Sequence, residues 1–230
     1  FMQTHYNYAN PNSFSLLGAP VNGYGGGQII AFMSAKTTQD TIVWLLRHAH
    51  PSEDIKIAFY TYDLLVISEA ILSARQSGND VTVCGDYRTC LGASTRDQLN
   101  RVIALKSAGV SVYLVAGLDI QPEYALIGKS VRPGIGILHQ KTALIGSWLV
   151  VGSTNFTTSS RNNRELSVLL WLDESSVKKY HELYKELAAS GELLTEQLIA
   201  TAEIDQEERR LRKQREKERR GTSSRSSASK

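Results

Sequence analysis

The stretch "LHQKTALIGSWLVVGSTN", residues 138–155, decides the interpretation of this chain. Its two apolar runs predict two strands, and the small, flexible pair Gly146 and Ser147 between them predicts a tight hairpin turn. Successive side chains of a strand point to opposite faces. His139 and Lys141, which are separated by a single residue, are therefore expected on the same face of the first strand.

The returning strand brings Ser153 and Asn155 back beside His139, whichever hairpin loop length the turn adopts. A phosphodiester is negatively charged, so an ammonium and an amide donor beside it stabilise the transition state when phosphorus is attacked. Lys141 and Asn155 fit these roles. An imidazole can serve as nucleophile or as general acid, but a single His139 cannot do both at once.

A carboxylate is also expected, because the second imidazole nitrogen needs a partner that fixes its tautomer. Glu165, in "SSRNNRELSVLL", is the candidate, although alone it would be an ordinary strand-end glutamate. The 138–155 pattern has no internal repeat, which indicates one motif per chain.

The composition supports one folded domain with a basic appendage. The chain has 230 residues, of which 42% are apolar, enough to fill a single core. The net charge of +3 is unevenly distributed, since residues 207–230 carry ten Lys and Arg against four Glu, leaving 16 − 19 = −3 for residues 1–206. Any polyanion-binding surface on the body must therefore be local.

Cysteine usage and hydropathy exclude some classes of protein. Cys84 and Cys90 lack the spacing of a zinc site, and Cys84, within "VTVCGDY", is expected to be a buried hydrophobe. The chain contains no apolar run of about 18 residues, as a membrane-spanning helix requires. The start reads as neither a signal nor a transit peptide, and localisation stays open between mitochondrial and cytoplasmic.

Strand and helix patterns alternate along the first half of the chain. Strands are predicted at 28–34, 54–62, 80–87 and 110–117, and helices at 37–49, 63–78 and 94–109, with Thr or Asp at the first helix start, Asp63 opening the second and Ser94 and Asp97 capping the third. This alternation implies a largely parallel sheet covered by helices. Residues 117–136 are expected to form a rim loop, 165–173 a central strand, and residues beyond 176 two helices.

The segments "HQKTALIG", "GSTN" and "NNRE" resemble the histidine-lysine motif, the Gly-Ser-x-Asn segment and the downstream Glu of the phospholipase D superfamily. The chain is most similar to its single-motif members, the bacterial endonucleases of that type and the Zucchini or mitochondrial cardiolipin hydrolase group. The similarity covers roughly residues 28–172. It implies an α/β fold, with a phospholipase D-like mixed sheet flanked by helices and one catalytic motif per chain.

The resemblance implies a role for each motif residue. His139 matches the catalytic histidine, Lys141 and Asn155 the phosphate-binding residues, Ser153 the hydroxyl beside them, and Glu165 the residue that orients the histidine. Such enzymes need neither a metal nor another cofactor, and single-motif chains form homodimers. One His139 would attack phosphorus while its counterpart in the second copy protonates the leaving group.

The sequence departs from the family at one place. The family has an Asp after four residues that follow the lysine, and Gly146 stands there. A hairpin shortened by one residue, with Gly at its turn, explains the change. The alternative is an active site that is losing its catalytic function. Further cations expected to rim the site and hold a polyanion are Arg88, Lys129, Arg132, Arg161 and Arg164.

The expected organisation is a lead-in at 1–27, a phosphodiesterase domain at 28–190, a charged helical extension at 191–220 and a disordered tail at 221–230. The leading function is a metal-independent endonuclease that cleaves single-stranded nucleic acid through a phosphohistidine. One alternative is a phospholipase D-type hydrolase of cardiolipin or another anionic phospholipid. A third is a catalytically weakened binding or scaffold protein of the same fold.

Overall fold

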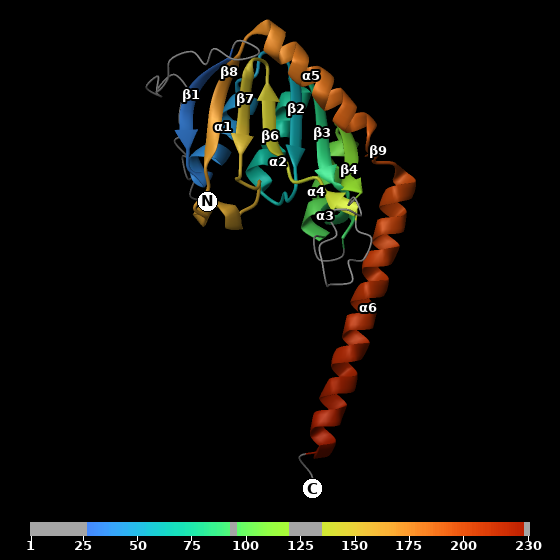
Figure 1. Ribbon diagram of the computed structural model, residues 1–230. Coiled ribbons are helices and arrows are strands. Elements are labelled where there is room, and N and C mark those ends of the chain that lie inside the picture. The colour runs from blue at the N-terminus through green and yellow to red at the C-terminus, as the bar shows by residue number, and fades with distance from the viewer. Residues whose placement is uncertain (1–26, 93–95, 120–134, 228–230) are drawn as a thin grey trace, which may run out of the picture.

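A mixed sheet of nine strands organises the part of the chain that the computed structural model describes, residues 27–92, 96–119 and 135–227 (Figure 1). The strands are β1 (Gly27–Met33), β2 (Asp54–Phe59), β3 (Asp80–Asp86), β4 (Ser111–Asp119), β5 (Ile135–Ile137), β6 (Lys141–Ile145), β7 (Trp148–Gly152), β8 (Ser167–Leu172) and β9 (Glu192–Leu193). Their order is β1-β8-β7-β6-β2-β3-β4-β5, and β9 pairs with β4. This is the expected mixed α/β architecture.

The parallel part of the sheet is smaller than the alternation predicts. Parallel pairing joins β2 to β3 and β3 to β4, whereas β1 pairs antiparallel with β8. The free edge of β2 is taken by β6, in a register that sets Ile55 opposite Ile145. The β6–β7 hairpin and β8 extend the sheet from that edge. As a result β1 cannot pair with β2, and it pairs with β8 at the end of the sheet.

Helices cover both faces of the sheet. They are α1 (Ala35–Arg47), α2 (Leu65–Gln76), α3 (Tyr87–Leu91), α4 (Arg96–Ser107), α5 (Glu174–Ala189) and α6 (Glu196–Ser227), with a 3-10 helix, η3 (Ser159–Asn162). The apolar sides of α1, α2 and α4 join the largest buried cluster on one face, and α5 crosses the other face (Figure 1). There the Tyr184 hydroxyl donates to Ile57 O at 2.6 Å, anchoring α5 to the sheet. Cys84 is fully buried on this face, as predicted.

Two helix starts differ from the prediction. Ser34 caps α1, accepting from the Thr37 N–H at 3.5 Å, so the helix begins before the expected Thr or Asp. At α2 the N-cap is Leu64, which makes no side-chain cap bond. Asp63 instead accepts from the Thr158 N–H at 2.7 Å, because a segment distant in sequence lies beside it. Ser94 and most of the expected lead-in and rim loop lie outside the described residues.

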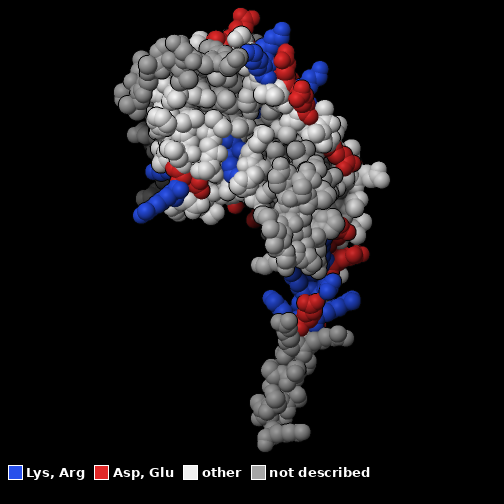
Figure 2. Space-filling model, viewed as in Figure 1, with Lys and Arg blue, Asp and Glu red and all other residues white. Residues whose placement is uncertain are grey.

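The last helix is longer than expected. It packs on the body through buried Ile199 and Ala202, and its outer part projects beyond the domain, carrying clustered Lys and Arg with fewer acidic residues (Figures 1 and 2). The helix runs to Ser227, into the tail that was expected to be disordered, since each added residue costs little once a helix is nucleated. Within the described ranges, no helix has the length and apolarity needed to cross a bilayer.

Candidate active site

The predicted polar residues meet at one edge of the sheet. At this edge β2, β3 and β7 end and β6 and β8 begin, bringing Tyr60, Asp86, His139, Lys141, Ser153, Asn155 and Glu165 to the same side of the domain. The hairpin turn has two residues, because Ile145 pairs with Trp148. The convergence inferred from the sequence is therefore present.

Lys141 begins β6 with a side chain that is only 4% exposed. Its Nζ donates to His139 O at 2.8 Å and lies 5.4 Å from the centroid of the Tyr60 ring. Among the described residues, this ammonium makes no ion pair and no second hydrogen bond. Burial lowers the pKa of Lys141, and the nearby carboxylate of Glu165 partly opposes that shift. A buried ammonium with unused donors is a preorganised site for an anion.

His139 is exposed, and its backbone carbonyl is the acceptor for this ammonium. It precedes β6, so strand alternation does not apply to it, and its exposed ring contrasts with the buried side chain of Lys141. The ring packs against Tyr60, with centroids 4.8 Å apart and planes at 55°. The imidazole and the Lys141 ammonium nevertheless both lie beside the Tyr60 ring, so the two side chains point to the same side of this edge. The exposed imidazole is available to an incoming ligand.

The position of His139 depends on a buried carboxylate that sequence reasoning missed. Asp86 is fully buried, and its Oδ2 accepts from the Leu138 N–H at 2.9 Å while Oδ1 accepts from the Thr89 N–H at 2.9 Å. Asp86 therefore fixes the backbone just before His139. Tyr60 was missed too, although both residues stand at the carboxyl ends of neighbouring parallel strands, where binding residues commonly gather.

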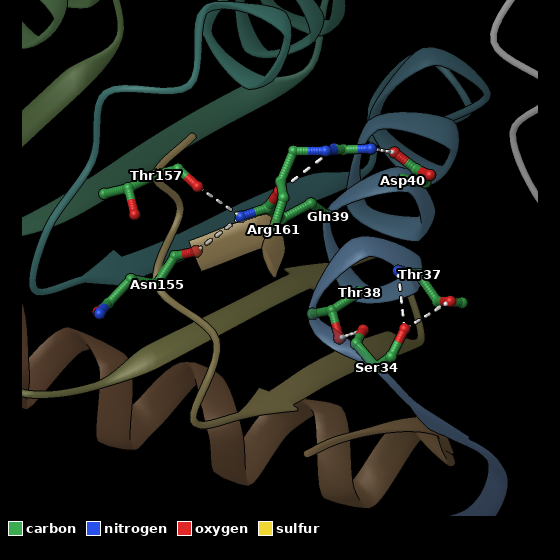
Figure 3. Close-up of polar contacts among 8 residues, drawn as sticks. All are labelled: Ser34, Thr37, Thr38, Gln39, Asp40, Asn155, Thr157 and Arg161. Carbon is green, nitrogen blue, oxygen red and sulfur yellow. Dashed lines mark hydrogen bonds and ion pairs between the residues drawn. The ribbon is translucent and has the colours of Figure 1, made fainter. Parts of the chain in front are cut away.

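The segment that carries Asn155 is clamped by α1. The Gln39 side chain is fully buried, and its Nε2 donates to both Asn155 O and Thr157 O at 2.9 Å (Figure 3). Phe156 between them donates its N–H to Thr61 O at 3.2 Å. Figure 3 shows the Asn155 side chain directed away from Gln39. Its Oδ1 is buried without a partner in the described part of the chain, so the amide is positioned but unsatisfied.

Arg161 differs from its expected rim role. Its Nη1 donates to Gln39 Oε1 at 3.2 Å, and its Nη2 pairs with Asp40 Oδ1 at 2.9 Å (Figure 3). Because the guanidinium is committed to α1, its charge is compensated. Arg161 therefore stabilises the Gln39 side chain that holds residues 155–157, and it does not present a free cation to a ligand.

Glu165 also has different partners from those expected. Its carboxylate accepts from Ser153 Oγ and from Asn163 Nδ2, the latter at 3.2 Å. In the residues that the structure describes, no hydrogen bond joins Glu165 to His139 of the same chain. The carboxylate therefore orients Ser153 and acts electrostatically on Lys141.

The remaining predicted cations are dispersed. Arg164 is exposed beside Glu165, and Arg88 lines a cavity of about 400 Å³ between α3 and α6. Lys129 and Arg132 lie outside the described residues. Within those residues, no cluster of His, Cys, Asp or Glu side chains is arranged as a set of metal ligands.

Gly146 lies at the opposite end of β6 from the site. Its φ of +55° is the left-handed conformation that favours glycine, and a Cβ there would lie 2.5 Å from Glu53 Oε1. The position that holds Asp in the family is thus a turn position here and is separated from His139 by the length of the strand.

Residues 42–188 match the family model described as "Cardiolipin synthase, PLD-like domain". The chain belongs to the phospholipase D superfamily. Membership makes it a phosphodiesterase-type enzyme, in agreement with an exposed imidazole, a buried ammonium and an unsatisfied amide at one edge. No curated protein sequence matches this chain.

Solved structures show the same phospholipase D-like fold. Nuc, a phospholipase D family member from Salmonella typhimurium, superposes with a TM-score of 0.56 at 17% identity, covering 74% of this chain and 99% of its own. NucT from Helicobacter pylori gives 0.56 at 19% identity, covering 71% and 98%. Phosphatidylserine synthase from Haemophilus influenzae gives 0.51 at 12% identity, covering 76% of this chain and 41% of its own.

Proposed function

We propose that this member of the superfamily is a metal-independent endonuclease that cleaves single-stranded nucleic acid through a phosphohistidine. The observation that carries the proposal is that the exposed imidazole of His139 and the buried ammonium of Lys141 both lie beside the Tyr60 ring. A phosphodiester oxygen can accept the unused ammonium protons, which places phosphorus beside the imidazole. The Nδ2 of Asn155, at the same edge, is the amide donor for the phosphodiester, because its unpaired Oδ1 can only accept.

The reaction has two displacements at phosphorus. In the first, a nitrogen of His139 forms a bond to phosphorus and the bond to the leaving oxygen breaks, with that oxygen taking a proton from a second imidazole. In the second, water gives a proton to this now neutral imidazole and its oxygen displaces the histidine nitrogen. Lys141 stabilises the charge that develops on the phosphoryl oxygens in both steps.

The second imidazole in this proposal is His139 of another copy of the chain. The motif occurs once per chain, and one imidazole cannot be nucleophile and general acid in the same step. Exposure of His139 leaves it accessible to a symmetry-related subunit. Light scattering should give a mass twice the chain's 25.4 kDa, and a monomer at working concentration would contradict the dimeric mechanism.

Nucleic acid is favoured as the substrate because cations extend beyond the catalytic lysine. Arg164 is exposed beside Glu165, and the outer part of α6 carries clustered Lys and Arg (Figure 2). Such charges suit a substrate with repeated phosphates. A phospholipid substrate is the second candidate, favoured by the family model's description and by Leu166, which is 62% exposed and donates its N–H to Ser153 Oγ at 3.2 Å.

The test offers labelled single-stranded oligonucleotides and cardiolipin vesicles separately, in excess chelator. We expect oligonucleotide cleavage that falls at least about a thousandfold in His139→Ala. His50→Ala is the matched control, because His50 is exposed before β2, at the opposite end of that strand from the site. Release of phosphatidic acid with oligonucleotides left intact would transfer the assignment to the lipid enzyme. Binding without turnover would indicate a scaffold.

A further inference from the structure

The two parts of α6 differ in their contact with the domain. In residues 196–206, Ile199 and Ala202 are buried, and Gln206 donates its Nε2 to Gly92 O at 3.2 Å. In residues 207–218 every side chain is exposed. The first part docks the helix, and the second projects from the body (Figure 1).

The helix leaves the body next to the catalytic edge. Residues of α3 and α6 together line the cavity of about 400 Å³, with Arg88 and Arg209 in its wall. The helix α3 directly follows Asp86, whose carboxylate holds the Leu138 N–H beside His139. Figure 1 shows α6 continuing beyond the edge of the sheet at which β2 and β3 end. The projecting part is therefore on the same side of the molecule as the site.

One face of the projecting part is cationic. Arg209, Lys213 and Lys217 are spaced four residues apart and form a continuous row along the helix. At 3.6 residues per turn, this basic row continues the face that Ala202 and Gln206 turn toward the domain.

The basic row keeps its charge uncompensated. Among the described residues, none of its three side chains is paired with a carboxylate, whereas Arg210 pairs with Glu207 at 2.6 Å and Arg212 with Glu216 at 3.2 Å. Desolvated or paired cations contribute little to long-range attraction, but three unpaired cations in line present a positive edge. The body carries −3 over residues 1–206, so the helix supplies this field.

We propose that the basic row binds successive backbone phosphates of a nucleic-acid strand whose scissile phosphodiester lies at His139. This inference rests on the proposed nuclease function and assigns α6 as the arm that holds the strand beside the site. The row is about 12 Å long at a rise of about 1.5 Å per residue, which is the span of a few phosphates.

A strand fits this geometry better than an anionic membrane. The row turns toward the side of the domain, where a flexible strand can pass between the helix and the catalytic edge. The opposite face of the projecting part carries three glutamates, Glu207, Glu208 and Glu218, against one cation, Arg215. An anionic bilayer reaching the helix from outside would meet these acidic side chains first, at an electrostatic cost.

The test compares two triple variants of the full chain in a His139→Ala background, which prevents cleavage. The first is Arg209→Gln with Lys213→Gln and Lys217→Gln. The control is Arg210→Gln with Arg212→Gln and Arg215→Gln, which removes the same charge from other faces of the helix. Anisotropy of a labelled single strand of about 20 nucleotides is measured between about 50 and 200 mM salt, and circular dichroism checks that the helix is retained.

We expect the row variant to bind about tenfold more weakly at low salt and its salt slope to decrease by about 2, the effect of three lost phosphate contacts. The control should change affinity by less than about threefold. Equal losses of affinity in both variants would show that binding depends on net charge alone, and would contradict the proposed role of the basic row. Weaker binding to anionic vesicles with unchanged oligonucleotide affinity would overturn the choice of nucleic acid.

A small chromogenic phosphodiester separates this inference from the proposed function. It reaches His139 but cannot reach α6, so the row variant with His139 intact should hydrolyse it at the rate of the unmodified chain. If the unmodified chain cleaves neither substrate, the proposed nuclease function is wrong. The oligonucleotide affinities of the two triple variants would still test whether the basic row binds the strand. Loss of small-substrate hydrolysis in the row variant would show that the substitutions damage the site itself, and would contradict the proposal that α6 acts only by holding the strand.

Discussion

The two segments that build the candidate active site are held in different ways. Residues 153–161 are tied down by Gln39, by the Thr61 carbonyl and by the carboxylate of Asp63. Residues 138–141 are held by the bond from Leu138 to Asp86, by burial of the Leu138 side chain and by pairing of Lys141 with β2, and they carry a buried ammonium that makes a single hydrogen bond among the described residues. The backbone of the first segment is fixed by hydrogen bonds from other elements, although this segment includes the unpaired Oδ1 of Asn155, whereas the second segment carries the buried ammonium with unused donors. Stability and activity should therefore respond separately to substitutions in the two.

The largest effect on activity is expected for Lys141→Met. Loss of the ammonium removes the charge that stabilises the phosphoryl transition state, so kcat/KM should fall by about a thousandfold or more. The thermal midpoint should stay the same or rise, because an apolar chain of similar length replaces a buried, weakly satisfied charge. Kinetics and thermal unfolding measured on one preparation check both parts.

Lys178→Met is the control for this substitution, since Lys178 is exposed on α5 and should change neither quantity. A fall of several degrees in the thermal midpoint of Lys141→Met would show that the lysine stabilises the fold. The contrast between the two segments would then be lost.

Gln39→Ala should have the opposite profile. It leaves the carbonyls of Asn155 and Thr157 without their donor, so we expect a loss of about 2–3 kcal/mol in the free energy of unfolding. Activity should fall about tenfold, through displacement of Asn155. Denaturant unfolding measures the first effect, and Gln76→Ala on the exposed side of α2 should stay within about 0.5 kcal/mol of the unmodified chain. An unchanged stability for Gln39→Ala would refute the clamp.

The smallest effect is expected for Glu165→Gln, and it concerns pH. Burial lowers the pKa of Lys141, and the charge of Glu165 raises it in opposition. Removing the carboxylate should lower that pKa further, so the ammonium is lost at lower pH and the basic limb of the kcat/KM profile moves in that direction. Near neutral pH, kcat/KM should fall by less than about tenfold. A basic limb that stays in place would mean that Lys141 does not set it.

Local patterns predicted the hairpin and the convergence well. The Gly146–Ser147 turn, the strand pairs around it and the meeting of Lys141, Ser153, Asn155 and Glu165 at one edge follow from spacing alone, because strand geometry transmits position along a few residues. The pairing of β1 with β8 did not follow, since it depends on which strand takes the free edge of β2.

Contacts between segments distant in sequence were outside the reach of those patterns. Gln39 resembles any polar residue of an amphipathic helix, and its burial is set by carbonyls 116 and 118 positions later in the chain. For the same reason Arg161 was expected on the rim and Asp63 at a helix cap, although both help to fix residues 153–161. A side chain's polarity indicates that it needs a partner, but the fold decides which one.

The Gly146 turn constrains how this sequence can change. A carboxylate restored at that position would have to accept a left-handed backbone and would lie against Glu53, whose Oε2 already accepts from the His50 N–H at 2.9 Å. Reversion to the family's aspartate is therefore epistatic with position 53. The Glu53 carboxylate would have to move away or be replaced to accommodate the aspartate.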